Sequence, residues 1–416
     1  MDRATTVERG RIHLIGVDQP GMPGLAEALA RSGREVSGST SGFNPAMSRL
    51  RDRGVRVDSG HSAHRLALGA QLVVPAPGTD RFHPELVAAI KHGIPRSSRA
   101  DLLAWLAEGR TVIAVEGDRA SNMAGAMIGW ILGQVGLDPS IILSRRVAQL
   151  GGWGVLGEGP HLVCTSTDLP DICPSILILL PCEASGPRLP ADWVLSRELL
   201  SGGPLPERVE QLSLDQSNAA WWAADIRQAR GQTRFRIFHH SDFVSEVWLK
   251  LPGVIPVWAA MAAMAACLRL GLGVEAIKMG LEDFAGVSRG FECRGTYRGV
   301  TLLDDDSADS AEATEALDLA RRIHGPRRLW AVVAASLMNP SRMPWPADRV
   351  MIVGSPPTGT PEYSARATVV AGRDEAIAEL DRSLEPGDVL LTLGAGDVGT
   401  IADEFLGRLS GNRKAG

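Results

Sequence analysis

The residues best suited to chemistry lie in a loop between an apolar stretch, Thr111–Val115, and a run of small residues that continues to Leu132. A strand, a glycine loop and a helix in this order are the usual setting of a phosphate-binding loop, where backbone N–H groups and the helix N-terminus face the anion. Such a loop also needs a Lys for the terminal phosphates and a hydroxyl for Mg²⁺. The residues available here are Gly117, Arg119, Ser121 and Asn122. They predict a degenerate nucleotide loop.

A second glycine loop follows the apolar residues at the start of the chain. Gly16, Gly21 and Gly24 would let the backbone approach a diphosphate at a helix N-terminus. The same glycines also suit a tight strand–helix turn that binds nothing. His61, further along, could contact a ligand or simply cap a turn.

An acidic cluster near the C-terminal end offers two interpretations. Asp304, Asp305 and Glu312 follow an apolar stretch and could hold a metal ion through oxygen ligands or an amine through charge. Alternatively, one Asp caps a helix that begins near Ser310, and the others are solvated. The adjacent pair His239–His240 does not predict a metal site, because neighbouring residues on a strand point to opposite faces.

Length, charge and cysteine content narrow the class of protein. A chain of 416 residues is too long for one core and suggests about three domains. The formal charge of −5 shows no basic surface for nucleic acid or an anionic membrane. The first residues lack the apolar core of a signal peptide, and Pro252 and Pro256 make the longest apolar stretch a buried helix, not a membrane span. Five cysteines without a short paired spacing favour reduced thiols in the cytoplasm.

Apolar strand-like runs alternate with helical segments, which predicts an α/β fold with parallel sheets covered on both faces. Breaks are expected near Glu108–Gly109 and after Phe284–Arg289, whereas Asp192–Gly231 is polar and hard to assign. The expected strands are Ile12–Gly16, Leu72–Val74, Val112–Val115, Ile176–Leu180, Val300–Leu303, Leu329–Val333, Val350–Val353 and Val389–Leu393.

Motifs along nearly the whole chain resemble the Mur ligase family, most closely its alanine-adding branch. Residues 12–27 resemble the family's opening strand, glycine loop and helix, Pro84–Glu85 and Arg99–Ala100 match later segments, and Pro386–Asp397 resembles a late strand and its turn. The resemblance implies three domains: a Rossmann-like domain of UDP-sugar-binding type (1–108), a central parallel-sheet domain of degenerate ATPase type (109–286) and a Rossmann-like C-terminal domain (287–416).

The resemblance also implies where ligands would bind. The first-domain residues that it places in the ligand site are Gly16, Gly21, Met22, Gly24, Ser39 and His61. In the third domain, the match to the family's hinge and acidic loop implies a possible site made of Arg289, Asp304, Asp305 and Glu312.

Four family motifs that meet around the nucleotide are replaced in this chain. Besides the loop, the acidic segment reads Cys164–Asp168, the next strand end reads Pro181–Ala184, and residues 252–259 lack the family's His and two Asn. Because phosphoryl transfer depends on positioning and charge neutralisation, their joint absence predicts that ATP and Mg²⁺ are no longer used. No catalytic or metal-ligating residue is then expected.

The resulting hypothesis is a cytoplasmic pseudoenzyme that binds a uridine nucleotide sugar or a partner biosynthetic enzyme, but neither nucleic acid nor a membrane. One alternative is an altered amide-forming ligase, of the type that joins an amino acid to UDP-N-acetylmuramate, in peptidoglycan or secondary metabolism. A third interpretation keeps the original alanine-adding activity with unconventional residues around the metal.

Overall fold

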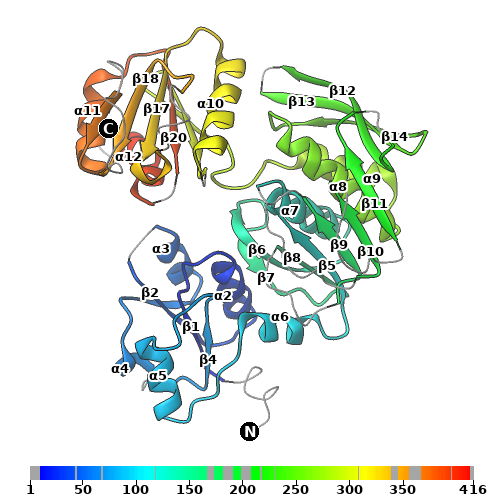
Figure 1. Ribbon diagram of the computed structural model, residues 1–416, viewed down its shortest axis with the longest axis vertical. Coiled ribbons are helices and arrows are strands. Elements are labelled where there is room, and N and C mark those ends of the chain that lie inside the picture. Colours follow the sequence, from blue (N-terminus) through cyan, green and yellow to red (C-terminus); the bar gives the residue numbers. More distant parts are fainter. Residues whose placement is uncertain are drawn as a thin grey trace. The chain divides into compact units, whose positions relative to one another are not determined.

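The computed structural model describes the chain from residue 10 onward with several gaps, and it divides into two compact units, Met1–Val287 and Ser288–Gly416. Each unit is considered by itself below (Figure 1). The described ranges are 10–42, 45–66, 69–117, 119–165, 173–180, 191–197, 208–215, 218–229, 231–307, 309–338, 345–355, 367–394 and 396–412. In these ranges, no helix combines the length and the apolar character needed to cross a membrane.

The first unit begins with a parallel sheet in the order β3-β2-β1-β4. The order changes direction between β1 and β4, and in such sheets the crevice at the carboxyl ends of the strands is the usual ligand site. The strands are β1 (Ile12–Ile15), β2 (Val36–Thr40), β3 (Arg56–Ser59) and β4 (Leu72–Pro75), and the helices are α2 (Met22–Arg31), α3 (Pro45–Asp52), α4 (Ala63–Leu66), α5 (Pro84–Lys91) and α6 (Arg99–Ala107).

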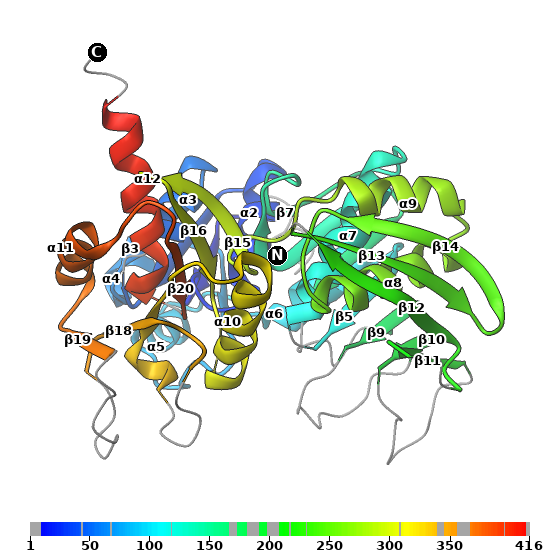
Figure 2. The ribbon, with the colours of Figure 1, turned by 90° about the horizontal axis from the view of Figure 1, so that it is seen from above.

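A ten-stranded sheet in the order β14-β13-β12-β11-β10-β9-β5-β8-β6-β7 forms the rest of this unit. Its centre is parallel, and Figure 2 shows the long antiparallel strands β12, β13 and β14 side by side. The strands are β5 (Thr111–Glu116), β6 (Ser140–Val147), β7 (Gly152–Val155), β8 (His161–Thr165), β9 (Ile176–Leu179), β10 (Trp193–Ser196), β11 (Val209–Ser213), β12 (Trp221–Ala229), β13 (Gln232–His239) and β14 (Asp242–Leu249).

Three helices accompany this sheet: α7 (Arg119–Gln134), α8 (Ile255–Arg269) and α9 (Val274–Asp283). The helix α8 is the apolar stretch that the sequence predicted to be buried. It begins with Pro256 in its first turn, where a missing N–H costs no hydrogen bond, and its middle is completely buried.

The two sheets of the first unit share one apolar core through α2 and the hairpin β6–β7. A side chain at Gly24 would stand 2.4 Å from the carbonyl oxygen of Leu143, so only glycine permits this close approach. Glu27 is fully buried, and its Oε2 accepts hydrogen bonds from the N–H groups of Trp153 (2.6 Å) and Gly154 (3.4 Å). The position Glu108–Gly109 lies inside this compact unit.

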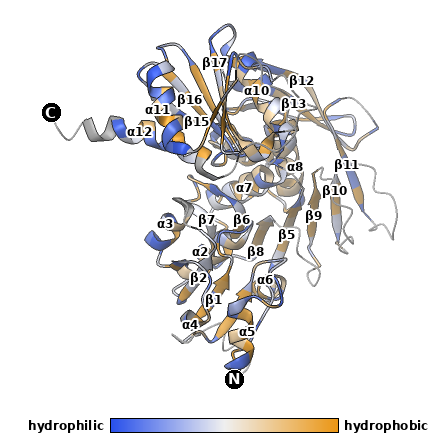
Figure 3. Cartoon of the chain, turned by 60° about the vertical axis from the view of Figure 1, so that its left-hand side comes forward, coloured by the Kyte–Doolittle hydropathy of each residue, from blue (hydrophilic) through white to orange (hydrophobic). Residues whose placement is uncertain are grey.

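The second unit has a six-stranded sheet in the order β15-β16-β20-β17-β18-β19, parallel except for the β15–β16 pair. It has its own apolar core, and Figure 3 shows its helix α11 as largely hydrophilic. Its elements are β15 (Glu292–Tyr297), β16 (Val300–Asp305), α10 (Ser310–His324), β17 (Leu329–Ala334), η1 (Ala335–Leu337), β18 (Arg349–Val353), β19 (Ala367–Val370), α11 (Arg373–Ser383), β20 (Val389–Leu393), η3 (Gly396–Thr400) and α12 (Ile401–Asn412). The predicted α/β fold, with its three sheets, is confirmed.

Candidate functional site

The glycine loop between β1 and α2 has the backbone conformation expected of an anion-binding turn. Gly16 has a φ of +70° and Gly21 a φ of +77°, values that favour glycine. Gly21 is the N-cap residue of α2 and provides no side-chain hydrogen bond to the helix. The first N–H groups of a helix carry a partial positive charge, so this turn favours an anion.

Arg99 adds a full positive charge to the same turn. It is 4% exposed and stands at the start of α6, where Ser98 and Asp101 form a capping box. A Cβ atom at Gly21 would stand 2.5 Å from the Arg99 Nη2. The guanidinium therefore packs directly on the glycine turn.

A pocket of about 330 Å³ connects this turn with the loop after β5. The sequence predicted both loops but gave no distance between them, and the structure brings them to one pocket. The lining residues are Gln19, Pro20, Pro77, Arg99, Val115, Gly117, Ser121, Asn122, Ser144 and Thr165.

The loop after β5 is tightly packed. Gly117 has a φ of +133°, and a Cβ there would lie 1.8 Å from the carbonyl oxygen of Leu180. The hydroxyl of Thr165 donates to Asn122 Oδ1 at 3.4 Å and accepts from the N–H of Ser144 at 2.9 Å. Arg119 begins α7 and is half-buried, although it does not line this pocket.

Sequence reasoning did not select Ser144, Thr165 or Arg99 as site residues. Thr165 is the last residue of β8. Arg99 is the first residue of α6, the helix that precedes β5. The position of Thr165 at the carboxyl end of a parallel strand was the available signal. Asp168 and Pro181–Ala184, where family motifs appeared to be replaced, lie outside the described residues.

Two residues of the predicted first-domain site are packing residues in the structure. Met22 is fully buried in the core, and Gly24 lies against the backbone of Leu143. Their role in ligand binding stays a prediction.

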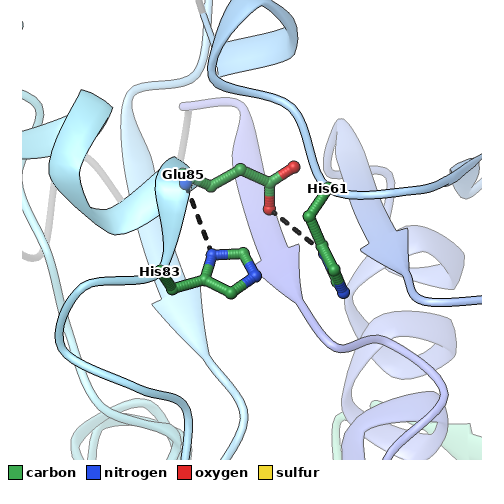
Figure 4. A group of neighbouring side chains, drawn as sticks. All are labelled: His61, His83 and Glu85. Carbon is green, nitrogen blue, oxygen red and sulfur yellow. Dashed lines mark hydrogen bonds and ion pairs between the residues drawn. The ribbon is translucent and has the colours of Figure 1, made fainter.

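Ser39 and His61, the other two predicted ligand residues, meet at Glu85 (Figure 4). The Ser39 hydroxyl donates to Glu85 Oε2 at 2.6 Å, and His61 Nδ1 lies 2.9 Å from Ser39 Oγ. His13 Nε2 is 3.5 Å from Glu85 Oε2, and the N–H of Ser62 donates to Oε1 at 3.0 Å. Burial raises the pKa of Glu85, but hydrogen bonds from His13, Ser39 and Ser62 outweigh it and bring the pKa to about 2.

His83 completes this group. Its Nδ1 accepts a hydrogen bond from the N–H of Glu85 at 3.3 Å, which caps α5, and its ring lies edge-on to that of His61 with centroids 4.5 Å apart. Burial, together with the neighbouring His61, lowers the pKa of His83. The ring is therefore mainly neutral at physiological pH.

In the second unit, the structure brings together three of the four residues predicted as a site. Arg289 Nε contacts Asp304 Oδ2 at 2.9 Å, the hydroxyl of Thr392 donates to Asp304 Oδ1 at 2.7 Å, and Asp305 accepts from the N–H of Phe291 at 2.8 Å. Both carboxylates are fully buried and serve to connect segments of this unit. Glu312 lies apart from them in the first turn of α10, whose N-cap is Asp309. The capping alternative is therefore right for Asp309, but its expectation that the other Asp residues are solvated is wrong for Asp304 and Asp305, which are buried. A ligand-binding role of the four predicted residues stays untested.

Comparisons with known proteins test the family resemblance. The model of the Mur ligase family, catalytic domain, matches residues 11–111. Two proteins named UDP-N-acetylmuramate–L-alanine ligase, from a Geobacter species and from Acetivibrio thermocellus, are each 28% identical, over 97% and 95% of this chain and 99% and 95% of their own lengths. The resemblance to the Mur ligase family is confirmed.

Solved structures of Mur ligases have the same fold. The UDP-N-acetylmuramate–alanine ligase of Thermotoga maritima superposes with a TM-score of 0.80 at 19% identity, covering 97% of this chain and 100% of its own. The murein peptide ligase of Psychrobacter arcticus gives a TM-score of 0.71 at 19% identity, with 96% and 98% covered. At 19% identity, the similarity to these two structures shows that the three-domain fold is shared.

The expectation that ATP and Mg²⁺ are lost is contradicted by these comparisons, because the relatives that match from end to end are named as ligases. The expectation rested on the joint replacement of four family motifs, which was taken to mean the loss of the site. Sequence reasoning could not see that the fold brings Arg99, which is remote in sequence from the loop after β5, to the same pocket.

Proposed function

We propose that this protein is an amide-forming ligase that joins an amino acid to UDP-N-acetylmuramate. The observation that carries the proposal is the nearly end-to-end match to relatives named for this reaction, at 28% identity over 97% of the chain. The pocket supports it, because it places the glycine turn of the first sheet beside the loop after β5. A ligase needs the nucleotide sugar and ATP to meet in this way.

Within this proposal, the positive groups of the pocket receive the phosphates. Arg99 and the N-terminus of α2 would hold the diphosphate of the nucleotide sugar. The backbone at Gly117 and the N-terminus of α7 would face ATP, with Arg119 in place of a Lys. The hydroxyls of Ser121 and Thr165 are oxygen groups of the kind that Mg²⁺ prefers. ATP, when bound, supplies the free energy for amide formation.

Binding of a uridine nucleotide sugar without ligation is the second candidate. It rests on the loop itself, since residues 116–134 contain no Lys. A partner enzyme and a cytoplasmic location also remain predictions.

A ligation assay separates these functions. The purified protein is incubated with UDP-N-acetylmuramate, ATP–Mg²⁺ and single amino acids including L-alanine, and phosphate release and product mass are measured. We expect a product heavier by one amino-acid residue, with stoichiometric phosphate release. Calorimetric binding of UDP-N-acetylmuramate without any product would favour the second candidate, and the absence of both would refute the assigned ligand class.

A further inference from the structure

A group of polar side chains beside the first sheet lies outside the pocket that the proposed function assigns to the phosphates, although the family resemblance implies a ligand role for His61. It comprises His61 after β3, and His83 and Glu85 at the start of α5 (Figure 4). Glu85 is fully buried, and its hydrogen-bond and ion-pair partners include Ser39, Ser62, His13 and His61. In the part of the chain that the structure describes, no Lys or Arg forms an ion pair with it. A buried carboxylate is costly unless a positive charge or a metal ion compensates it.

His83 provides a nitrogen that the protein itself does not use. Its Nε2 is buried and has no hydrogen-bond partner among the described residues. Buried polar atoms are nearly always paired, so such an atom calls for a ligand. His83 comes from the loop after β4 and His61 from the loop after β3, and both rings lie around the Glu85 carboxylate in Figure 4.

The three side chains fit the ligand set of a transition metal. One nitrogen of each imidazole and one oxygen of Glu85 all lie within 4.8 Å of one another. Zinc bonds of about 2.1 Å place tetrahedral ligands roughly 3.4 Å apart. Small side-chain rotations would therefore bring the three ligand atoms to this spacing. Two imidazoles and one carboxylate suit Zn²⁺ or a similar ion, whereas Mg²⁺ prefers oxygen ligands alone.

We propose that His61, His83 and Glu85 bind a divalent transition-metal ion, with zinc as the reference ion, at a site separate from the nucleotide pocket. Three protein ligands leave a fourth position for water or a further ligand. Ser39, through its 2.6 Å hydrogen bond to Glu85, is a positioning residue that orients the carboxylate.

The proton balance of the site is simple. The Ser39 hydroxyl donates its proton to Glu85, so in the metal-free protein His61 must donate to Ser39 from Nδ1. His83 accepts a hydrogen bond at Nδ1, so its ring proton is on Nε2. When a nitrogen that carries the proton becomes a ligand, that proton moves to the other ring nitrogen. At His83 this sacrifices the 3.3 Å bond from the N–H of Glu85, which is the longest hydrogen bond of the group. No net charge other than that of the metal is added.

Zinc titration of the full chain, free of nucleotide, tests the proposal. His83→Asn removes the imidazole but keeps a side chain that caps α5 well. His61→Gln removes the second nitrogen, and His64→Gln, at an exposed neighbouring position, is the matched control. We expect one zinc ion per wild-type chain by calorimetry, binding weakened at least about tenfold in His83→Asn and His61→Gln, and unchanged binding in His64→Gln.

Cobalt provides a second readout, because a Co²⁺ ion in a tetrahedral site has a visible absorption band that the His83→Asn variant should lose. Circular dichroism shows whether each variant is folded. The proposal is overturned if the wild type shows no saturable zinc binding, or if His83→Asn binds zinc as well as the wild type does. In the latter case the ion is held elsewhere, for example by the exposed Cys173 or Cys293.

Discussion

Arg99 supplies positive charge to a pocket in which the loop after β5 has no Lys. Charge-assisted hydrogen bonds contribute about 1.5 to 3 kcal/mol each. We therefore expect Arg99→Gln to weaken the binding of UDP-N-acetylmuramate by about tenfold to a hundredfold in isothermal calorimetry. Arg96→Gln changes an exposed arginine of the preceding loop and should leave the affinity unaltered. Equal affinities of the wild type and Arg99→Gln would remove Arg99 from the ligand site.

Because of Glu85, the free energy of unfolding of the metal-free protein should depend on pH in the acid range. Its pKa falls from 4.5 to about 2 on folding, so its contribution is complete above pH 4.5 and disappears as the pH decreases toward 2. We expect Glu85→Gln to lower the free energy of unfolding at pH 7 by on the order of 2 to 3 kcal/mol. The difference from the wild type should shrink between pH 4.5 and pH 2, as measured by urea denaturation in the presence of a chelator. Glu275→Gln, an exposed position, serves as the control, and a difference that stays constant with pH would contradict the assignment.

Helix α2 packs closely against β6 because position 24 is a glycine. A Cβ at position 24 would stand 2.4 Å from the Leu143 carbonyl oxygen, so Gly24→Ala should destabilise the first unit by about 1 to 3 kcal/mol. Gly133→Ala is the matched change in α7, where a Cβ meets nothing within 4 Å, and it should stabilise by about 0.5 to 1 kcal/mol. Urea denaturation of both variants checks the pair. If both variants gain stability, the close contact of α2 with β6 is wrong.

The sequence predicted eight strands because each is a continuous apolar run, but the parallel strands β3, β8, β10 and β11 were not among them. All eight expected strands exist, among them β5, β17 and β20, with ends that differ by at most two residues. The antiparallel strands β12 and β13 were missed because polar residues interrupt their apolar pattern. In β13, Arg234 and Arg236 alternate with buried residues, and the second half of β12 is largely exposed. The same limit applies to the candidate site. The spacing of glycines predicted the two loops of the site. Residues from other elements, such as Arg99, reach these loops through the packing between sheets, which the sequence does not show.

At the scale of the molecule, the two compact units should respond independently to mutation. Asp304 is fully buried and pairs with Arg289 at 2.9 Å inside the second unit. Removing one partner of a buried ion pair costs about 3 kcal/mol or more, so Arg289→Ala should lower the unfolding temperature of the second unit and leave the first unit unaffected. Differential scanning calorimetry measures both transitions.

Arg298→Ala is the control for this experiment. Arg298 (φ +47°) resembles Arg289 (φ +59°) in its positive φ, and it also pairs with an Asp of the second unit. Its side chain is 68% exposed, so its loss should cost less than about 1 kcal/mol. A joint shift of both transitions in Arg289→Ala would mean that the units unfold together. The two boundaries between the three domains expected from the sequence are not decided by this experiment and stay predictions.

The buried carboxylate of Glu27 has a consequence for how the chain is made. Its partner Trp153 follows 126 residues later, on the edge strand β7. At a synthesis rate of 5 to 20 residues per second, Glu27 leaves the ribosome roughly 6 to 25 seconds before that strand. During this interval the face of α2 that later covers β7 is exposed on the nascent chain. Once β7 emerges, α2 covers its unpaired edge and so removes a surface on which nascent chains could aggregate.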